Sequence, residues 1–520
     1  MSMSEQIDLA WSLLPLYLTQ HILLSASAML LALAIALPLI IICTQFSGWR
    51  RFLLGAASVI QTIPGLALLA LFYPILLGLS HLTNALFSVT FPALGFLPSL
   101  LALALYALLP ILRNGVTGLL GVDTLVSEAA DGVGMTARQK LLQIELPLAA
   151  PVLMSGIRIA TVWTIGTATL ATSVGQVSLG NYIFSGLQTE NWVSVAFGCL
   201  AATALALAAD FALSLIEAGL ALRNRKKIGF GLLILISGVI FALTPALFES
   251  KKDYVVGAKN FSEQFILAQL IENRLESLGA SVKQRESLGS AVAFRALAND
   301  EIDVYVDYSG TLWSNVLGRT DNPPRESLLI NLKQELRSQY GITLLGTLGF
   351  ENAYVLAMKD AQAQKMGIVS TTDLSAKSQN LRLGSDLEFL NRPEWKKLKN
   401  SYGLLFQSEK SFTPTFMYRA LESNEVDVIS AFSSDGRIKA QNLRVLTDPL
   451  NAAPTYDALI LIAPKRVNDE FLRRALLPMV SAIDVRQMQE ANYMVDRDVN
   501  KSTVNKAAQF LENQIPVIKK

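Results

Sequence analysis

The chain is poor in the side chains that build metal centres and disulfide frameworks. It has 520 residues but only two cysteines, Cys43 and Cys199, and two histidines, His21 and His81. The cysteines have no metal-ligand spacing, and the histidines are far apart, so we expect neither a disulfide framework nor a metal site. All four lie in the first half, so the second half has no histidine or cysteine from which a paired catalytic or metal site could be built, and a membrane enzyme is disfavoured. The net charge of +2 gives no reason to expect nucleic-acid binding.

Charge is also scarce, but only in the first half of the chain. Residues 1–248 contain 10 Lys or Arg and 9 Asp or Glu, about 8% of the positions, whereas residues 249–520 contain 34 and 33, about 25%. The first composition is that of a membrane domain and the second that of an ordinary soluble domain. We therefore predict a transmembrane domain over 1–248 and a separate domain over 249–520.

Long uncharged runs predict six transmembrane helices. Residues 22–43 contain no charge, and residues 52–112 contain none either, which is too long for one span. A turn over Leu79–Pro92 would divide the longer run. The predicted spans are 22–43, 52–78, 94–112, 148–174, 193–222 and 228–248. The first lacks the features of a cleaved signal peptide, so we expect it to be retained.

Basic residues in alternate loops set the direction of these helices. The clusters are Arg50 and Arg51, then Arg113, Arg138 and Lys140, then Arg223, Arg225, Lys226 and Lys227. The positive-inside rule places these loops in the cytoplasm, so the N-terminus and the whole second domain should lie outside. Within the spans, we interpret Arg158 and Glu217 as charges that reach toward the cytoplasmic surface. The role of Asp210, which lies deeper, is left open.

The cytoplasmic stretch "EAADGVGMTARQKLLQIELP" (Glu128–Pro147) interrupts the apolar sequence. Ser127 could cap a first short helix, and Gly132 and Gly134 would separate it from a second. Pro147 should end the loop where the next span begins. Two short helices joined by a glycine turn would make a rigid projection suited to a groove on a partner protein.

This stretch resembles the EAA loop of bacterial ABC importer permeases. The matching residues are Glu128, Ala129, Ala130, Gly134, Ile144, Leu146 and Pro147. The resemblance implies that the loop docks on a cytoplasmic ATPase subunit and that the permease pairs with a second copy of itself. The chain has no phosphate-binding loop of its own: "GQVSLGNY" (Gly175–Tyr182) has Asn181 where lysine is required. ATP and magnesium should therefore belong to the separate ATPase, with no cofactor in this chain.

The second domain shows alternating strand and helix patterns, which predicts an α/β architecture. It also contains an internal repeat, in which "FRALANDEIDVYVDYS" (Phe294–Ser309) aligns without gaps on "YRALESNEVDVISAFS" (Tyr418–Ser433). The repeat predicts two similar lobes with a cleft between them. Tyr308 and Phe432, each at the end of a predicted strand, could face each other there. Two aromatic faces would suit a quaternary ammonium ion, which has no N–H to donate; the alternative is that both rings belong to the core.

The second domain resembles the binding proteins of osmoprotectant importers, which take up glycine betaine, choline, carnitine and related solutes. The motifs are "GAKNFSEQ", "DVYVDYSGT", "ENAYVLAM", "GSDLEF", "VISAFSSDGRI" and "APTYDALI". The resemblance implies a two-lobed α/β fold of the type II periplasmic binding proteins, with lobe one over about 253–350 and 457–520 and lobe two over about 351–456. It also implies a binding site: an aromatic cage of Tyr308, Tyr354, Phe432 and Tyr456, polar contacts from Asn260, Gln264 and Thr311, and Asp435 beside the cleft or the cation.

These resemblances imply a permease of the inner membrane that carries its own extracytoplasmic binding domain for a quaternary-ammonium solute. Some fused chains of this kind resemble importers of ergothioneine, and Arg382, Glu388 and Arg392 could meet its larger polar tail. A solute-sensing membrane receptor is the less favoured alternative, because no cytoplasmic signalling domain is evident.

Overall fold

The computed structural model describes residues 3–89, 91–189, 191–248, 253–319, 321–453, 455–497 and 500–516. The chain divides into two compact units, which are described separately. The membrane unit contains Ile7–Phe184 and Val193–Ser250. The second unit contains Lys251–Lys520 together with Met1–Gln6 and Ser185–Trp192.

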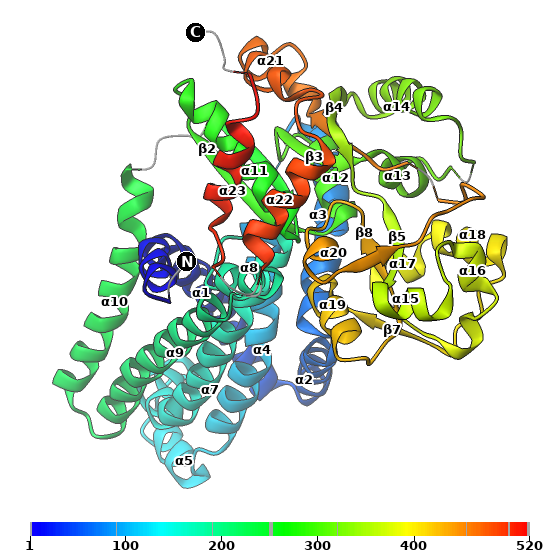
Figure 1. The fold of residues 1–520 in the computed structure, drawn as a ribbon. Coiled ribbons are helices and arrows are strands. Elements are labelled where there is room, and N and C mark those ends of the chain that lie inside the picture. The colour runs from blue at the N-terminus through cyan, green and yellow to red at the C-terminus, as the bar shows by residue number, and fades with distance from the viewer. Residues whose placement is uncertain are drawn as a thin grey trace. The chain divides into compact units, whose positions relative to one another are not determined.

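The membrane unit is entirely helical in the part of the chain that the structure describes (Figure 1). Its helices are α1 (Met3–Gln45), α2 (Ser47–Thr62), α3 (Gly65–Phe87), α4 (Phe96–Leu120), α5 (Thr124–Gly132), α6 (Ala137–Lys140), α7 (Leu146–Ala168), α8 (Gly180–Gln188), α9 (Trp192–Ala221) and α10 (Arg225–Phe248). Six helical stretches among the described residues are long and apolar enough to span a membrane, and they include α1, α3, α4, α7, α9 and α10. The predicted number of spans is thus confirmed.

The bounds of the second span were predicted wrongly. Residues 52–78 do not form one helix, because α2 ends at Thr62 and a new helix begins at Gly65. Pro64 explains the break, since proline has no N–H for the helix and also restricts the backbone of the preceding residue. The predicted turn over Leu79–Pro92 is helical as far as Phe87. The first span is also longer than predicted, because α1 begins at Met3.

Helices α4 and α7 form a closely packed pair. A Cβ atom at Gly156 of α7 would lie 2.6 Å from both the Pro110 carbonyl oxygen and the Cβ of Asn114 on α4. A Cβ at Gly118 of α4 would lie 3.0 Å from the carbonyl oxygen of Ala149. Glycine at these positions therefore allows a backbone approach that any other residue would prevent.

The second unit is built on two five-stranded mixed sheets, which confirms the predicted α/β class. The first has the order β2-β1-β3-β10-β4 and the second the order β7-β6-β8-β5-β9. The strands are β1 (Tyr254–Lys259), β2 (Val282–Leu288), β3 (Val304–Tyr308), β4 (Thr343–Glu351), β5 (Tyr354–Lys359), β6 (Arg382–Asp386), β7 (Ser408–Phe412), β8 (Val428–Phe432), β9 (Leu443–Val445) and β10 (Asp457–Ile462). In each sheet three strands run parallel, and the strand beside the third, β10 or β5, is antiparallel to it.

Helices cover these sheets. They are α11 (Ser262–Ser277), α12 (Ser290–Ala298), α13 (Ser309–Thr311), α14 (Arg325–Tyr340), α15 (Asp360–Met366), α16 (Thr371–Ser375), α17 (Leu387–Asn391), α18 (Pro393–Tyr402), α19 (Pro414–Glu422), α20 (Arg437–Ala440), α21 (Glu470–Leu476), α22 (Val485–Asp496) and α23 (Val504–Glu512). Figure 1 shows α11, α22 and α23 together beside the first sheet, where their apolar faces join its core. The second sheet has apolar clusters of its own.

The internal repeat of the sequence corresponds to a structural repeat. Helix α12 and strand β3 occupy the same positions in the first copy as α19 and β8 in the second. The turn between helix and strand has a residue with positive φ in both copies, 62° at Asp300 and 61° at Asn424. The aspartate before each strand accepts a backbone N–H in the same way, Asp303 from Val255 and Asp427 from Arg382. The two lobes are therefore built on one helix–turn–strand plan.

Candidate functional site

The carboxyl ends of β3 and β8 each present one aromatic ring, as predicted. Tyr308 ends β3, and Phe432 ends β8. The two rings do not contact each other among the described ring pairs, and the ring of Phe261 contacts both. The centroid of Phe261 is 6.2 Å from that of Tyr308 and 6.3 Å from that of Phe432, and both pairs are stacked. The three rings thus form a layered aromatic stack drawn from both sheets.

A second aromatic group surrounds Tyr354 at the start of β5. Its ring centroid lies 4.8 Å from Phe432, 4.5 Å from Phe389 and 5.8 Å from Tyr456. Tyr354 and Phe432 are half-buried, whereas Tyr308 and Tyr456 are buried and belong to the core of the first lobe. The four predicted cage aromatics thus lie in one connected cluster, and two of them also serve as core.

The Tyr308 hydroxyl belongs to a buried polar network around Glu263. It donates to the Glu263 carboxylate at 2.6 Å and accepts from the Gln264 side chain at 2.9 Å. Glu263 also accepts from Asn352 at 3.0 Å and from Asn492 at 2.9 Å. Burial raises the pKa of Glu263 above its usual range and raises that of the Tyr308 phenol well above its usual range. The network fixes the Tyr308 ring and ties α11 and α22 to the connection between the sheets.

Arg392, between α17 and α18, places a guanidinium over the aromatic cluster. Its guanidinium carbon lies 5.2 Å from the centroid of Tyr354, a geometry typical of a cation–π contact. Within the described residues, its hydrogen-bond partners are Glu388, Glu394 at 3.4 Å, the Tyr456 hydroxyl at 3.4 Å and the Thr311 hydroxyl at 3.4 Å. Its side chain is only 5% exposed, and its Nε has no hydrogen-bond partner within the part of the chain that the structure describes.

A second cation lies at the other end of the aromatic stack. The Nζ of Lys259 is 5.3 Å from the centroid of Tyr308 and pairs with the buried carboxylate of Asp307. The site therefore combines aromatic faces with two buried positive side chains. Such a site can hold an organic cation against the rings and a carboxylate against Arg392 or Lys259.

Beside this cluster, the cavity that borders Phe261, Glu263 and Phe432 holds about 30 Å³. This is room for one or two water molecules but not for a solute of the predicted class. This cavity therefore has to widen before it can hold such a solute.

The predicted polar contacts have different outcomes. Gln264 and Thr311 are buried and bond to Tyr308 and Arg392, as described above. Asn260 is exposed, and Arg382 pairs with Asp427 at the start of β6, at the opposite end of that strand from the aromatic cluster. The suggestion that Arg382 meets the tail of a solute is therefore wrong, because Arg382 begins β6 and lies about 13 Å along the strand from Asp386, which leads into the aromatic cluster.

Asp435 contacts a cation of the protein itself. Its carboxylate is 3.1 Å from the Arg437 guanidinium, which lies 3.2 Å from Asp496 at the end of α22. Asp496 in turn accepts from Ser262 of α11 at 2.5 Å. Asp435 thus contributes to a buried ionic connection between α20 and the helices of the first lobe; the role beside the cleft or the cation stays a prediction.

Phe261, Phe389 and Glu263 were missed as members of this cluster. All three lie inside sequence motifs that were recognised, "GAKNFSEQ" and "GSDLEF". The spacing of these residues in the sequence does not distinguish them from core residues. Their contacts with the cluster depend on how the segments after β1 and β6 meet, and those strands belong to different sheets. Among the described residues, no group of three His, Cys, Asp or Glu side chains is arranged to hold a metal ion.

The cytoplasmic stretch forms two helical pieces joined by a glycine turn. The first is α5, which is capped by Asp123 and not by Ser127 as predicted, because Asp123 accepts the Leu125 N–H at 2.9 Å. Gly134 has φ of 81°, which only glycine adopts without strain. Lys140 of α6 pairs with Asp131 of α5 at 2.9 Å and closes the turn.

Pro147 does not end the loop. The helix runs without a break from Ala137 to Val174, through a π-helical turn at Leu141–Glu145. A proline in the first turn of α7 is tolerated because the π-helical turn already alters the hydrogen bonding there. Of the predicted contact residues, Glu128, Ala129, Gly134 and Pro147 are exposed, Ala130 is buried, and Ile144 and Leu146 are half-buried. Exposed apolar side chains also gather here, with Leu125 70% and Val133 77% exposed.

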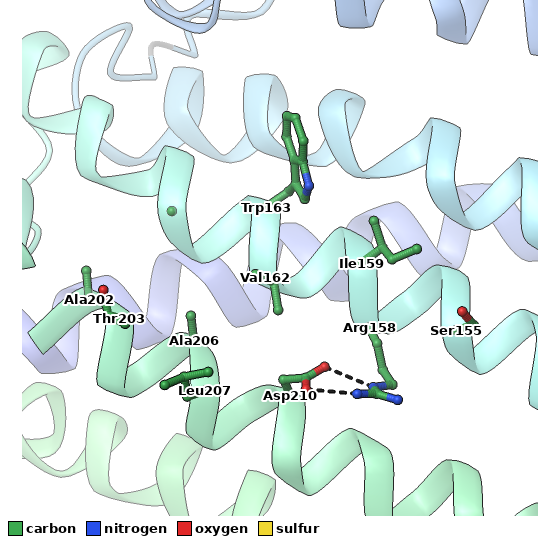
Figure 2. A pocket seen from close by; sticks show the side chains of 11 residues that line it. Ser155, Arg158, Ile159, Val162, Trp163, Ala202, Thr203, Ala206, Leu207 and Asp210 are labelled. Carbon is green, nitrogen blue, oxygen red and sulfur yellow. Dashed lines mark hydrogen bonds and ion pairs between the residues drawn. The ribbon is translucent and has the colours of Figure 1, made fainter. Parts of the chain in front are cut away.

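The intramembrane charges pair with one another, which corrects the interpretation of Arg158 and Glu217 as snorkelling side chains. Arg158 of α7 makes two hydrogen bonds to Asp210 of α9, at 2.9 and 2.8 Å (Figure 2). It makes one to Glu217, also of α9, at 2.8 Å.

Two family models match this chain. Residues 252–513 match the substrate-binding domain of the ABC-type glycine betaine transport system, and residues 35–222 match the inner membrane component of binding-protein-dependent transport systems. The chain is therefore the permease and the binding domain of an ABC importer in one polypeptide. It belongs to the family of glycine betaine-type ABC transport proteins, and its binding domain is extracytoplasmic.

The chain is also similar to individual proteins, over most of its length or over part of it. The chain is 30% identical to an ergothioneine transport permease/ergothioneine binding protein of Helicobacter pylori, over 89% of this chain and 83% of that protein. It is 38% identical to a choline transport system permease protein of Bacillus subtilis, over 38% of this chain and 84% of that protein. A crystal structure of a glycine betaine/carnitine/choline ABC transporter matches 50% of this chain and 98% of that chain, at 25% identity and a TM-score of 0.45.

Proposed function

We propose that this chain imports a small quaternary-ammonium solute of the glycine betaine, choline and carnitine class, and that it favours members which also carry a carboxylate. The observation that supports the proposal is the buried Arg392 guanidinium beside the Tyr354 ring. A cation of the protein, Arg392, occupies one aromatic face in this structure. A trimethylammonium group would replace it there, and a carboxylate on the same solute would give Arg392 a new partner.

The replacement of Arg392 by the solute's cation at the Tyr354 ring also explains the proposed preference for solutes with a carboxylate. A solute with a carboxylate can displace Arg392 from the ring and then pair with it, which adds a charged partner to Glu388 and Glu394 and can satisfy the Nε that has none within the described residues. Choline offers only the cation, so it would bring a further positive charge near Arg392 and Lys259 without adding a carboxylate partner for either. Charge-assisted hydrogen bonds contribute about 1.5–3 kcal/mol each, which is enough for strong selection.

Ergothioneine is the second candidate. It also carries a trimethylammonium group and a carboxylate, with a thio-imidazole ring in addition, so the same contacts apply. The observation in its favour is that the Helicobacter pylori relative, named for ergothioneine transport and binding, is similar over 89% of the present chain, across both units.

The proposed assembly contains two copies of this chain and a separate cytoplasmic ATPase, which would supply ATP and magnesium. The exposed apolar side chains and the Gly134 turn of the cytoplasmic loop support docking at that position. The binding domain, tethered to its own permease, would be present at a high effective concentration.

Titration calorimetry of the full chain in nanodiscs tests the proposal. The solutes are glycine betaine, carnitine, ergothioneine and choline, with glycine and histidine as unmethylated controls. We expect at least one trimethylammonium carboxylate to bind at least tenfold more tightly than choline, and neither unmethylated amino acid to bind. In Arg392→Met the advantage of the carboxylate over choline should disappear.

Equal binding of glycine or histidine would refute the aromatic recognition of the cation. Preference for choline in the unmodified chain, or an unchanged preference in Arg392→Met, would refute the role of Arg392.

A further inference from the structure

The charged side chains within α7 and α9 bond only to one another among the contacts that the structure describes. Arg158 is the single charged residue of α7, and Asp210 and Glu217 are the only two of α9. All three are partly exposed, at 31%, 32% and 26% of their side chains. Figure 2 shows the guanidinium of Arg158 extending from α7 to the carboxylate of Asp210 on the neighbouring helix.

Arg158, Asp210 and Glu217 form a charged triad, which lies at a groove between α7 and α9. The groove holds about 700 Å³ and is lined by small and apolar side chains such as Val162, Gly166, Ala206 and Leu207, with Arg158 and Asp210 on its wall. Much of α7 and α9 is therefore not in direct contact along this face. The bonds of Arg158 connect the two helices across the groove.

The triad cannot face lipid at low cost. One guanidinium and two carboxylates carry a net charge of −1, and intramembrane charges are normally directed to protein or to water. The planar guanidinium binds Asp210 with two hydrogen bonds and Glu217 with a third, which is the geometry in which arginine differs most from lysine. In a medium of low dielectric constant these contacts are strong, and removal of one partner is costly.

The other end of α7 is continuous with the cytoplasmic loop. The helix runs from Ala137 in that loop to Val174, so it passes through Arg158 without interruption. Arg158 lies about 18 Å along the axis from Leu146, at 1.5 Å per residue. Gly156, only two residues before Arg158, holds α7 against α4, the helix that leads into the same loop. A displacement of the loop must therefore move α4 and α7 together.

We propose that Arg158 is a positioning residue for transport: it transmits the movement of the cytoplasmic loop and α7 to α9 through Asp210 and Glu217. The inference rests on the chain being an ABC importer and not on the identity of the solute. Without the triad, α7 would move and α9 would not follow, so the ATPase would turn over without opening the pathway.

Cys199 provides a reporter on α9 that requires no solute. It is exposed, whereas the other cysteine, Cys43, is buried. The experiment uses the full chain with its ATPase in nanodiscs and measures the rate at which N-ethylmaleimide, a small maleimide that enters the bilayer, labels Cys199 near the outer end of α9, without nucleotide and after trapping with ATP and vanadate. We expect the unmodified chain to show a nucleotide-dependent change of at least threefold, and Arg158→Met to show none.

Four further single variants and one double variant separate coupling from folding. Arg158→Lys keeps the charge but cannot form the planar double contact, so it should retain only part of the change. Arg158→Asp and Asp210→Arg should each abolish it, and the two together should restore it. Arg225→Met, which removes a positive charge at the exposed start of α10, is the matched control and should behave as the unmodified chain.

Two other measurements distinguish this proposal from the proposed function. Binding of glycine betaine and ergothioneine should have the same affinity in Arg158→Met as in the unmodified chain, while ATPase activity should no longer respond to them. If neither solute binds the unmodified chain, the proposed function fails, and the labelling of Cys199 still decides the role of Arg158. A nucleotide-dependent change that persists in Arg158→Met, or is absent from the unmodified chain, would overturn the proposal, as would a charge-swapped pair that assembles without recovering the change.

Discussion

Tyr354 is the single side chain at which most of the site's aromatic contacts meet. It contacts Phe432, Phe389 and Tyr456, and Arg392 lies over its face. A half-buried ring with this many neighbours is held rigidly, so it can receive a cation without the cost of being ordered first. Its hydroxyl is not needed for that role, because the attraction comes from the face of the ring.

We therefore predict that Tyr354→Ala weakens solute binding roughly five- to thirtyfold, the equivalent of about 1–2 kcal/mol for a desolvated cation–π contact. Tyr354→Phe, the matched control, should bind almost as well as the unmodified chain. Calorimetric titration with the tightest-binding solute measures both. Equal losses in the two variants would assign the role to the hydroxyl and not to the ring.

Asp386 carries a buried negative charge directly before α17. Its Oδ1 caps α17 by accepting the Phe389 N–H at 2.9 Å, and its Oδ2 has no hydrogen-bond partner within the described residues. Burial raises its pKa to about 6. Because the folded-state pKa lies above the unfolded value of about 3.9, protonation favours folding. This contribution is complete below pH 4 and is lost as the pH rises through 6.

Asp386→Asn should remove this dependence, because an asparagine oxygen can still cap the helix. We expect the variant to be about 2–3 kcal/mol more stable than the unmodified chain at pH 7.5, with the difference declining toward pH 4.5. Chemical unfolding of the binding domain, followed by tryptophan fluorescence, gives the two free energies at each pH. A stability difference that does not change between these pH values would show that the Asp386 charge is not the cause.

At the scale of helices and strands, the features that could be predicted are those set by local sequence pattern, and the features that were missed are those set by tertiary contacts. The number of spans follows from apolar length, and the repeat predicted the matching positions of α12 with β3 and α19 with β8. The break at Pro64 was missed because residues 52–78 remain uncharged through it. The contacts of Phe261 with Tyr308 and Phe432, and the pairing of Arg158 with Asp210, depend on tertiary neighbours that no local pattern contains.

The cytoplasmic loop depends on the backbone of Gly134. Its φ of 81° is unfavourable for any residue with a Cβ, whereas Gly132 lies at the end of α5 without such a constraint and has open space around it. We predict that Gly134→Ala lowers solute-stimulated ATP hydrolysis by severalfold, since about 1 kcal/mol of strain would displace α6 from α5. Gly132→Ala should have little effect. Normal stimulation in Gly134→Ala would show that the turn tolerates the strain.

The packing of α4 against α7 permits a similar paired comparison within one helix. Gly156→Ala would force the two backbones apart, and overpacking of this kind costs about 1–3 kcal/mol. Gly166→Ala, also in α7, meets nothing within 4 Å and should be neutral or slightly stabilising. Thermal unfolding in detergent should show a lower midpoint for Gly156→Ala alone. Equal midpoints for the two variants would argue against close α4–α7 packing.

At the scale of the whole molecule, one polypeptide contains both the domain that selects the solute and the permease that the solute passes through. The two units have separate cores and different compositions, and the binding domain has its own two-lobed plan. A chain organised in this way should not depend on a freely diffusing binding protein, because each permease carries one.

ATP-driven uptake by proteoliposomes is the most direct test of this account. They would contain only the full chain and its ATPase, and would be supplied with radiolabelled glycine betaine or ergothioneine. We predict uptake of at least one of these solutes without any added soluble binding protein, strongly reduced in Tyr354→Ala. Uptake that requires an added binding protein, or that is unaffected by Tyr354→Ala, would contradict the account.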